Sequence, residues 1–177
     1  YDRHMRELGP EARRRIARLG PADRFRYELG SAYQEVRTLA DARRVLGRLV
    51  RRHVRGQSER VRRTVRQAAA VELLVTAMET HASARTVERA LDVVETCGYE
   101  TLSERTMVAC VLARYARKTR RLIPRAWLAV EQTVSRAERG VRNTTARHYA
   151  GAALLKNLGR LSGAPHGLRE RLERLRG

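Results

Sequence analysis

The sequence predicts an all-α protein, and three observations support this prediction. No segment alternates convincingly between apolar and polar residues, and the Asn-Gly and Asp-Gly pairs of tight hairpins are absent. Apolar residues instead recur three and four positions apart, as on one face of a helix. Helix start signals recur about every 20 residues, at Ser83, Ser103, Pro124 and Asn143. Doubled to about 40 residues, this spacing is the period of two-helix solenoid repeats.

We therefore expect antiparallel helix pairs stacked as a short α-solenoid, with an irregular helical bundle as the alternative. The 177 residues suffice for a real hydrophobic core. We expect arginine-rich helices over residues 1–56, a helical-pair repeat region over 57–163, and a short helix or tail over 164–177. The longest apolar runs, such as 107–113, stop short of the roughly 20 residues that cross a bilayer, so membrane insertion is not expected.

Glycine, proline and capping residues predict the helix boundaries in the N-terminal part. Two Gly-Pro pairs each end one helix and begin the next. Ser31 with Gln34 forms a capping box, Asp41 offers a further helix start, and Gly56 closes that helix. The helices expected here cover residues 10–19, 21–29, 31–37 and 42–54.

Similar signals predict the helices of the remaining chain. Ser58 and Ser83 are N-caps, and Gly98 and Gly140 are stops. The helices expected here cover residues 58–80, 83–97, 103–121, 124–139, 143–161 and 168–175. Their apolar stripes place Trp127 and Tyr149 inward, which favours core packing over base stacking. Tyr115 faces nearer a basic stripe.

Charge is the strongest compositional signal. The chain has 38 Lys+Arg against 19 Asp+Glu, a formal net charge of +19, and only Lys118 and Lys156 are lysines. A GC-rich genome favours arginine over lysine without any ligand, but this bias does not explain the missing acid. We expect a polyanionic partner, most simply RNA, with an acidic protein or an anionic membrane surface as alternatives.

The two kinds of helix in the repeat differ in net charge. At an offset of 42 residues, 111–114 aligns with 153–156 as apolar residues followed by a base. Segment 103–121 has a net charge of +5, whereas segment 83–97 has −1. Because first helices line one surface of a solenoid and second helices the other, the first-helix surface is the predicted binding face.

The run Cys110-Val111-Leu112-Ala113-Arg114-Tyr115-Ala116, followed by a helix that begins at Pro124, resembles the degenerate pair repeats of organellar heptatricopeptide and octotricopeptide proteins. The resemblance covers about Ser58 to Gly163. It implies an RNA-binding solenoid of a mitochondrion or plastid, of the kind that processes transcripts or belongs to mitochondrial ribosomes. It gives a class of partner and no base-recognition code, because no repeat here aligns without shifts.

Two sets of basic residues are the predicted phosphate contacts, with a solvated helix face as the alternative for each. Guanidinium groups can fork onto phosphates or stack on unpaired bases. One stripe consists of Arg114, Arg117, Lys118 and Arg121, and the densest cluster consists of Arg51, Arg52, Arg55, Arg60, Arg62, Arg63 and Arg66.

No pattern in the sequence predicts an enzyme, a cofactor or a metal site. The five histidines have no metal-binding spacing, and Cys97 and Cys110 lie too far apart in sequence for a zinc motif, so buried thiols are expected. No P-loop or GxGxxG is present. Glu72 and Glu79 are more simply explained by ion pairs with arginines than by catalysis.

The functional prediction is a basic RNA-binding helical-repeat protein that is a component of an organellar ribonucleoprotein, such as the mitochondrial ribosome. Its partners would be RNA, above all rRNA, and other proteins of that complex, and its location mitochondrial. Another organelle, the cytoplasm or a nucleoid are alternative locations. The rival functions are nonspecific DNA binding in a nucleoid or chromatin, and a protein scaffold for acidic partners.

Overall fold

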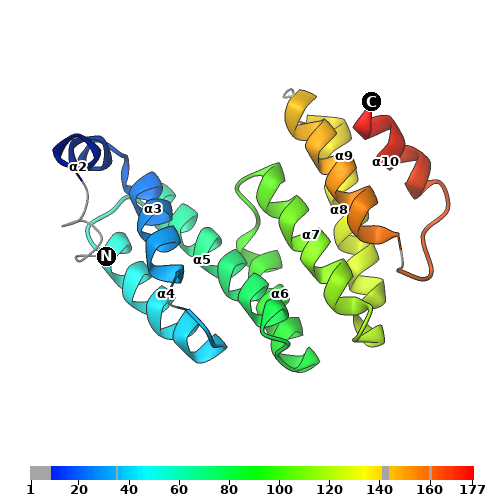
Figure 1. Cartoon of the computed structure of the whole chain (residues 1–177), viewed down its shortest axis with the longest axis horizontal. Helices are drawn as coiled ribbons and strands as arrows, with labels where there is room; N and C mark the ends of the chain where they lie inside the picture. The colour runs from blue at the N-terminus through cyan, green and yellow to red at the C-terminus, as the bar shows by residue number, and fades with distance from the viewer. Residues whose placement is uncertain (1–8, 35, 141–143, 160) are drawn as a thin grey trace.

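The computed structural model describes residues 9–34, 36–140, 144–159 and 161–177. These residues form α-helices and one 3-10 turn, with no strand, which confirms the all-α prediction (Figure 1). No described helix combines the length and hydropathy that crossing a membrane requires. The elements are α2 (Pro10–Ala17), α3 (Pro21–Tyr33), α4 (Leu39–Val54), α5 (Glu59–Glu79), α6 (Ala84–Cys97), α7 (Leu102–Ala116), η1 (Arg120–Leu122), α8 (Ile123–Gly140), α9 (Thr144–Leu158) and α10 (Leu168–Arg176).

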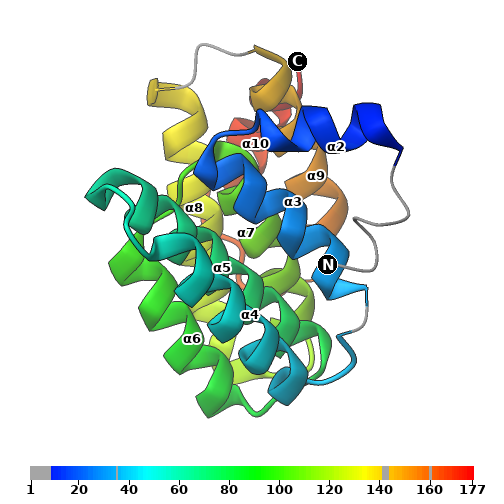
Figure 2. The ribbon, with the colours of Figure 1, turned by 90° about the vertical axis from the view of Figure 1, so that its left-hand side faces the viewer.

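From α3 onward the helices form antiparallel pairs in two layers (Figures 1 and 2). In the first layer α5 packs on α3 and α7, and α7 packs on α9. The second layer contains α4, α6, α8 and α10, and each of these packs on its neighbour in the first layer. The first-layer helices α5, α7 and α9 begin at residues 59, 102 and 144, which are 43 and 42 residues apart. This spacing agrees with the repeat expected from the sequence.

The start signals at Ser58 and Ser83 are confirmed. The Ser58 hydroxyl accepts a hydrogen bond from the backbone N–H of Val61, and that of Ser83 accepts one from Thr86. Gly98 ends α6 with a φ of 78°, a left-handed conformation that favours glycine.

Three other predicted starts are wrong, two of them because a better capping box lies a few residues away. Thr38 caps α4 and Asp41 is its third helical residue, so Asp41 does not open the helix. Thr101 caps α7 in the same way, with Glu104 reaching back, so Ser103 already lies inside the helix. Ser31 opens no helix, because α3 continues through it to Tyr33.

The predicted ends also move at several helices. The helix expected over 10–19 ends at Ala17, and the helix expected over 21–29 continues to Tyr33. The helix expected to reach residue 121 ends at Ala116, and a turn and η1 follow. The helix expected to reach residue 161 ends at Leu158. Its expected start at Asn143 lies outside the described residues. The α10 helix packs Leu168, Leu172 and Leu175 into the core, each only 2% exposed, so it is not a frayed tail.

The core consists of two apolar clusters that share α5. The smaller cluster joins α3 and α4 to the N-terminal half of α5 through Phe25, Leu46 and Val65. The larger cluster joins the C-terminal half of α5 to α6 through α10 and includes Leu112 and Leu154, both fully buried. Because one continuous helix enters both clusters, α3 and α4 are anchored to the pairs that follow.

The prediction that Tyr149 packs in the core is wrong, because this residue is 60% exposed. The neighbouring Ala150 and Gly151 are buried instead, and Gly151 faces α10. A Cβ on Gly151 would lie 2.8 Å from the backbone N of Arg176 and 3.0 Å from the carbonyl oxygen of Leu172. The close approach of α9 and α10 therefore requires a residue without a side chain, and Tyr149 is turned outward.

Replacing Gly151 by Ala should lower the free energy of unfolding by about 1–3 kcal/mol, because the atoms that the new methyl group would meet are backbone atoms that cannot rotate away. Gly30→Ala is the matched control. Gly30 lies in α3, and nothing lies within 4 Å of a Cβ placed there. This substitution should stabilise the protein by about 0.4–1 kcal/mol. Urea unfolding of both variants measures the difference, and a Gly151→Ala protein as stable as wild type would contradict the close α9–α10 contact.

Candidate nucleic-acid interface

The two predicted groups of basic residues lie at opposite ends of the helices. Because adjacent helices are antiparallel, the α4–α5 and α6–α7 turns form one rim (the first rim) and the α5–α6 and α7–α8 turns form the other (the second rim; Figure 1). At the first rim, Gln67 Nε2 donates a 2.6 Å hydrogen bond to the carbonyl of Cys97. At the second rim, the Tyr115 hydroxyl donates to the carbonyl of Ala82. The structure therefore does not bring the two groups together.

Five arginines around the α4–α5 turn form an exposed group that we call the α4–α5 arginine cluster. The turn is closed by Gly56, whose φ of 70° favours glycine, and by Ser58 as the cap of α5. Each of the five side chains is exposed, and none forms an ion pair with a described residue. The cluster consists of Arg51 on the last turn of α4, Arg55 directly after that helix, and Arg60, Arg63 and Arg66 on the first turns of α5.

The other two predicted residues of this region have partners within the chain. Arg52 Nη1 lies 3.4 Å from Glu28 Oε2. Arg62 Nη2 lies 3.0 Å from Glu59 Oε2, and its Nε is buried without a hydrogen-bond partner among the described residues. These contacts hold the two side chains beside the cluster. Less of each guanidinium group is therefore available to a ligand.

The predicted basic stripe at the end of α7 also contains both residues with partners in the chain and residues without an ion pair to a described residue. Arg121 forms a two-pronged contact with Glu88 of α6, with Nε 3.0 Å from Oε1. The hydrogen bonds with Glu88 raise the pKa of Arg121, so it stays charged and paired. Arg117 donates to the carbonyl of Asn157. Arg114 and Lys118 are exposed and form no ion pair with a described residue, so half of the predicted stripe serves interhelical contacts.

Acidic residues of the second layer pair with arginines farther along the chain. Arg125 of α8 joins Asp92 at 2.7 Å and Glu95 at 2.6 Å, both on α6. Arg171 of α10 lies 2.6 Å from Glu138 of α8, and these hydrogen bonds lower the pKa of Glu138. The carboxylates of segment 83–97 therefore contact neighbouring helices, although Asp92 and Glu95 stay exposed.

Sequence reasoning missed Arg125 and Arg171, although a signal was present. Glu88 and Arg121, Asp92 and Arg125, and Glu138 and Arg171 are each 33 residues apart. A repeated carboxylate–arginine spacing of 33 residues, against helix starts 43 and 42 residues apart, could have indicated pairing between helices of neighbouring repeats.

The aromatic side chains provide no ring for stacking on the predicted stripes. Trp127 is 7% exposed, as expected for a core residue, and its Nε1 donates a 2.8 Å hydrogen bond to the carbonyl of Ser162. Tyr115 is 8% exposed and is held by its hydrogen bond to Ala82. Any RNA contact at the end of α7 would therefore depend on charge alone.

No group of three or more histidine, cysteine or acidic side chains suited to a metal occurs in the described part of the chain. Burial raises the pKa of the Cys110 thiol to about 11, which makes it a weak nucleophile at neutral pH.

Glu72 and Glu79 form no ion pair with a described residue, contrary to expectation. Burial raises the pKa of Glu72, and the nearby charges of Glu79 and Glu104 raise it further.

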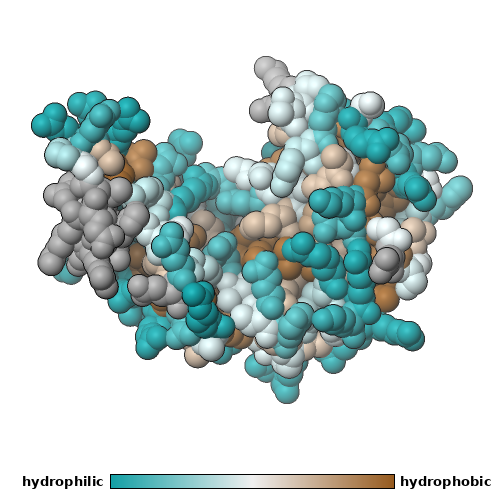
Figure 3. Space-filling model, viewed as in Figure 1, coloured by the Kyte–Doolittle hydropathy of each residue, from teal (hydrophilic) through white to brown (hydrophobic). Residues whose placement is uncertain are grey.

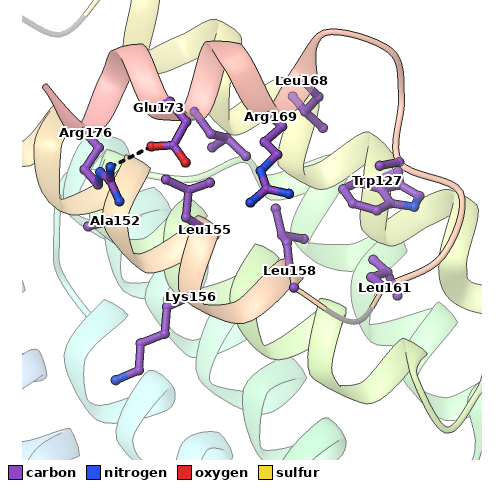
Figure 4. A pocket seen from close by; sticks show the side chains of 13 residues that line it. Trp127, Ala152, Leu155, Lys156, Leu158, Leu161, Leu168, Arg169, Glu173 and Arg176 are labelled. Atoms are coloured by element: carbon purple, nitrogen blue, oxygen red, sulfur yellow. Dashed lines mark ion pairs between the residues drawn. The ribbon is translucent and has the colours of Figure 1, made fainter.

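A groove of about 610 Å³ lies between α9, α10 and the segment that joins them (Figure 4). Leu155, Leu158 and Trp127 form its apolar wall, and Arg169 reaches across its opening, while Lys156 points away (Figure 4). Hydrophobic surface also shows in the middle of the face seen in Figure 3, whereas hydrophilic residues gather at the left end and along the lower edge. Arg176 also lines the groove and pairs with Glu173 at 2.8 Å (Figure 4).

Arg121→Gln should lower the melting temperature, because it removes the contact with Glu88 that joins η1 to α6. Arg114→Gln is the control: it removes the same charge from an exposed side chain without an ion pair among described residues and should leave the melting temperature unchanged. The difference should shrink at about 1 M salt, where charges on the surface are screened beyond roughly 3 Å. Equal melting temperatures for the two variants at low salt would show that Arg121 is not a structural residue.

The comparison with protein-family models, with curated proteins and with solved structures gave no match. The resemblance to organellar helical-pair repeats stays a prediction, and the surface of the chain itself carries the functional argument.

Proposed function

We propose that this chain binds RNA and that the RNA strand lies along the α4–α5 arginine cluster. The cluster presents its guanidinium groups on two helix ends joined by one tight turn. A guanidinium can fork onto a phosphate or stack on an unpaired base, which suits single-stranded RNA better than an ammonium group would. The protein would thus bind the strand at the first rim of the helix stack.

The observation that carries this proposal is the local lack of countercharge. Most described carboxylates already pair with arginines of the chain. Neither α4 nor the N-terminal half of α5 carries a carboxylate without an ion pair. Like charges three or four residues apart on a helix repel by about 0.2–0.5 kcal/mol per pair. A polyanion supplies the charge that the chain itself lacks. The described carboxylates without an ion pair are Glu72, Glu79, Glu131 and Glu170.

The direction of α5 adds to the positive potential. The N-terminus of a helix carries a partial positive charge of about half an elementary charge. Arg60, Arg62 and Arg63 occupy the first turns of α5, where basic residues are least favourable. Helix N–H groups and guanidinium groups therefore attract the same phosphates.

An organellar ribonucleoprotein, such as the mitochondrial ribosome, is the setting that the resemblance implies, and we include it in the proposal. Other proteins of that complex would then contact the faces that RNA leaves open. Nonspecific binding of duplex DNA is the rival that the first experiment separates from RNA binding.

The affinity of the chain for single-stranded RNA should fall steeply with salt. Its logarithm should decrease by about 0.7 for each neutralised phosphate per log unit of salt concentration, because each contact releases counterions. Fluorescence anisotropy with a labelled RNA and a duplex DNA of equal charge measures both slopes. Equal affinity for the two at about 150 mM salt would favour the DNA-binding rival, and a flat salt profile would contradict polyanion binding.

Replacing the five arginines of the α4–α5 arginine cluster by Gln should weaken RNA binding about a hundredfold or more at 150 mM salt and reduce the salt slope by about 0.7 per lost contact. A control variant loses the same charge elsewhere, at Arg85, Arg89, Arg136, Arg139 and Arg174, which are exposed and form no ion pair with a described residue. If both variants lose affinity equally, net charge and not this surface determines binding.

A further inference from the structure

The groove between α9 and α10 has the size and the lining of a site for a small ligand. Its volume of about 610 Å³ lies within the range of about 300–1,000 Å³ typical of such sites. Leu155 is half-buried and Ala152 and Ala164 are exposed, so a ligand can reach apolar surface. The bulkiest apolar side chains of the lining are those of Trp127, Leu155, Leu158, Leu161, Leu168 and Leu172.

Arg169 places a positive charge beside this apolar surface. Its side chain is exposed, forms no ion pair with a described residue, and reaches across the opening of the groove (Figure 4). The two other basic residues of the lining are placed differently. Arg176 pairs with Glu173 at 2.8 Å, and Lys156 points away (Figure 4). Among the described lining residues, the groove therefore offers one guanidinium group next to apolar side chains.

These groups select the chemistry of the ligand. A guanidinium group binds a carboxylate through two parallel hydrogen bonds, and apolar side chains bind a hydrocarbon chain by removing it from water. The phosphate backbone of RNA supplies the charge without the hydrocarbon chain. An acidic helix of another protein would present several carboxylates, and one guanidinium group can pair with only one of them. A single carboxylate at the end of a hydrocarbon chain matches both features of the groove.

We propose that this groove binds a free fatty acid, with its carboxylate on Arg169 and its hydrocarbon chain along Ala152, Leu155 and Leu158. The site does not depend on the proposed RNA binding, because the groove and the α4–α5 arginine cluster lie on different helices. Trp127 lines the groove and is the only tryptophan of the chain, so its fluorescence reports whether the groove is occupied.

Isothermal titration calorimetry of the wild-type chain with decanoate, octanoate, acetate and decanol tests the proposal. Decanoate should bind and change the emission of Trp127, and each CH₂ group removed from the ligand should weaken binding about fourfold. Acetate, which lacks the hydrocarbon chain, should not bind measurably. Decanol, which lacks the charge, should bind about tenfold more weakly than decanoate, because a hydrogen bond to a charged group is stronger than one to a neutral group.

Three results of this titration would overturn the fatty-acid site. They are no binding of decanoate, equal binding of decanoate and either acetate or decanol, and binding that leaves the emission of Trp127 unchanged. None of these results bears on the affinity for RNA, so the proposed function would stand or fall by its own experiments.

Arg169→Gln tests the charged group directly. It should weaken the binding of decanoate about tenfold and remove the preference for decanoate over decanol, because the hydrocarbon contacts remain. Arg174→Gln is the matched control and should bind decanoate as wild type does. Arg174 is exposed on the same helix, is not among the residues that line the groove, and forms no ion pair with a described residue. An equal loss of affinity in both variants would show that net charge attracts the carboxylate and would overturn the proposal.

Discussion

Burial of apolar side chains against the first layer holds the second-layer helices, and pairs of arginine and carboxylate groups link successive helices of that layer. The α6, α8 and α10 helices are linked by Arg121 and Arg125 on the acidic face of α6 and by Arg171 on Glu138. The chain has twice as many basic as acidic residues, so this pairing uses most carboxylates and leaves many arginines without countercharge. The paired arginines join the helices, and the α4–α5 arginine cluster is left without countercharge among the described residues.

Local signals predicted the fold class, the two-helix period and the caps at Ser58 and Ser83. The predictions failed where two local signals competed, as at α7, where Thr101 with Glu104 completes a capping box and Ser103 does not. Tyr149 was assigned to the core by helical spacing, but the neighbouring Gly151 allows α10 to approach so closely that the tyrosine is turned outward. Such outcomes depend on packing between helices, which periodicity within one helix does not contain.

The candidate site, too, could be predicted only in part. The density of arginines around Gly56 is visible in the sequence, and the structure leaves five of them exposed and without an ion pair to a described residue. Which arginines have partners could not be predicted, because Arg121 and Glu88 lie 33 residues apart and meet only when the helices stack.

Cross-linking tests the central claim, that RNA lies on the α4–α5 arginine cluster, most directly. A photoreactive RNA containing 4-thiouridine is cross-linked to the protein, and a protease that cleaves after glutamate then releases peptides 36–59 and 60–72, which together contain all five arginines of the cluster. The account predicts that these two peptides carry most of the cross-linked nucleotide. Cross-links confined to peptide 105–131, which contains the stripe at the end of α7, would place the RNA on the second rim and contradict it.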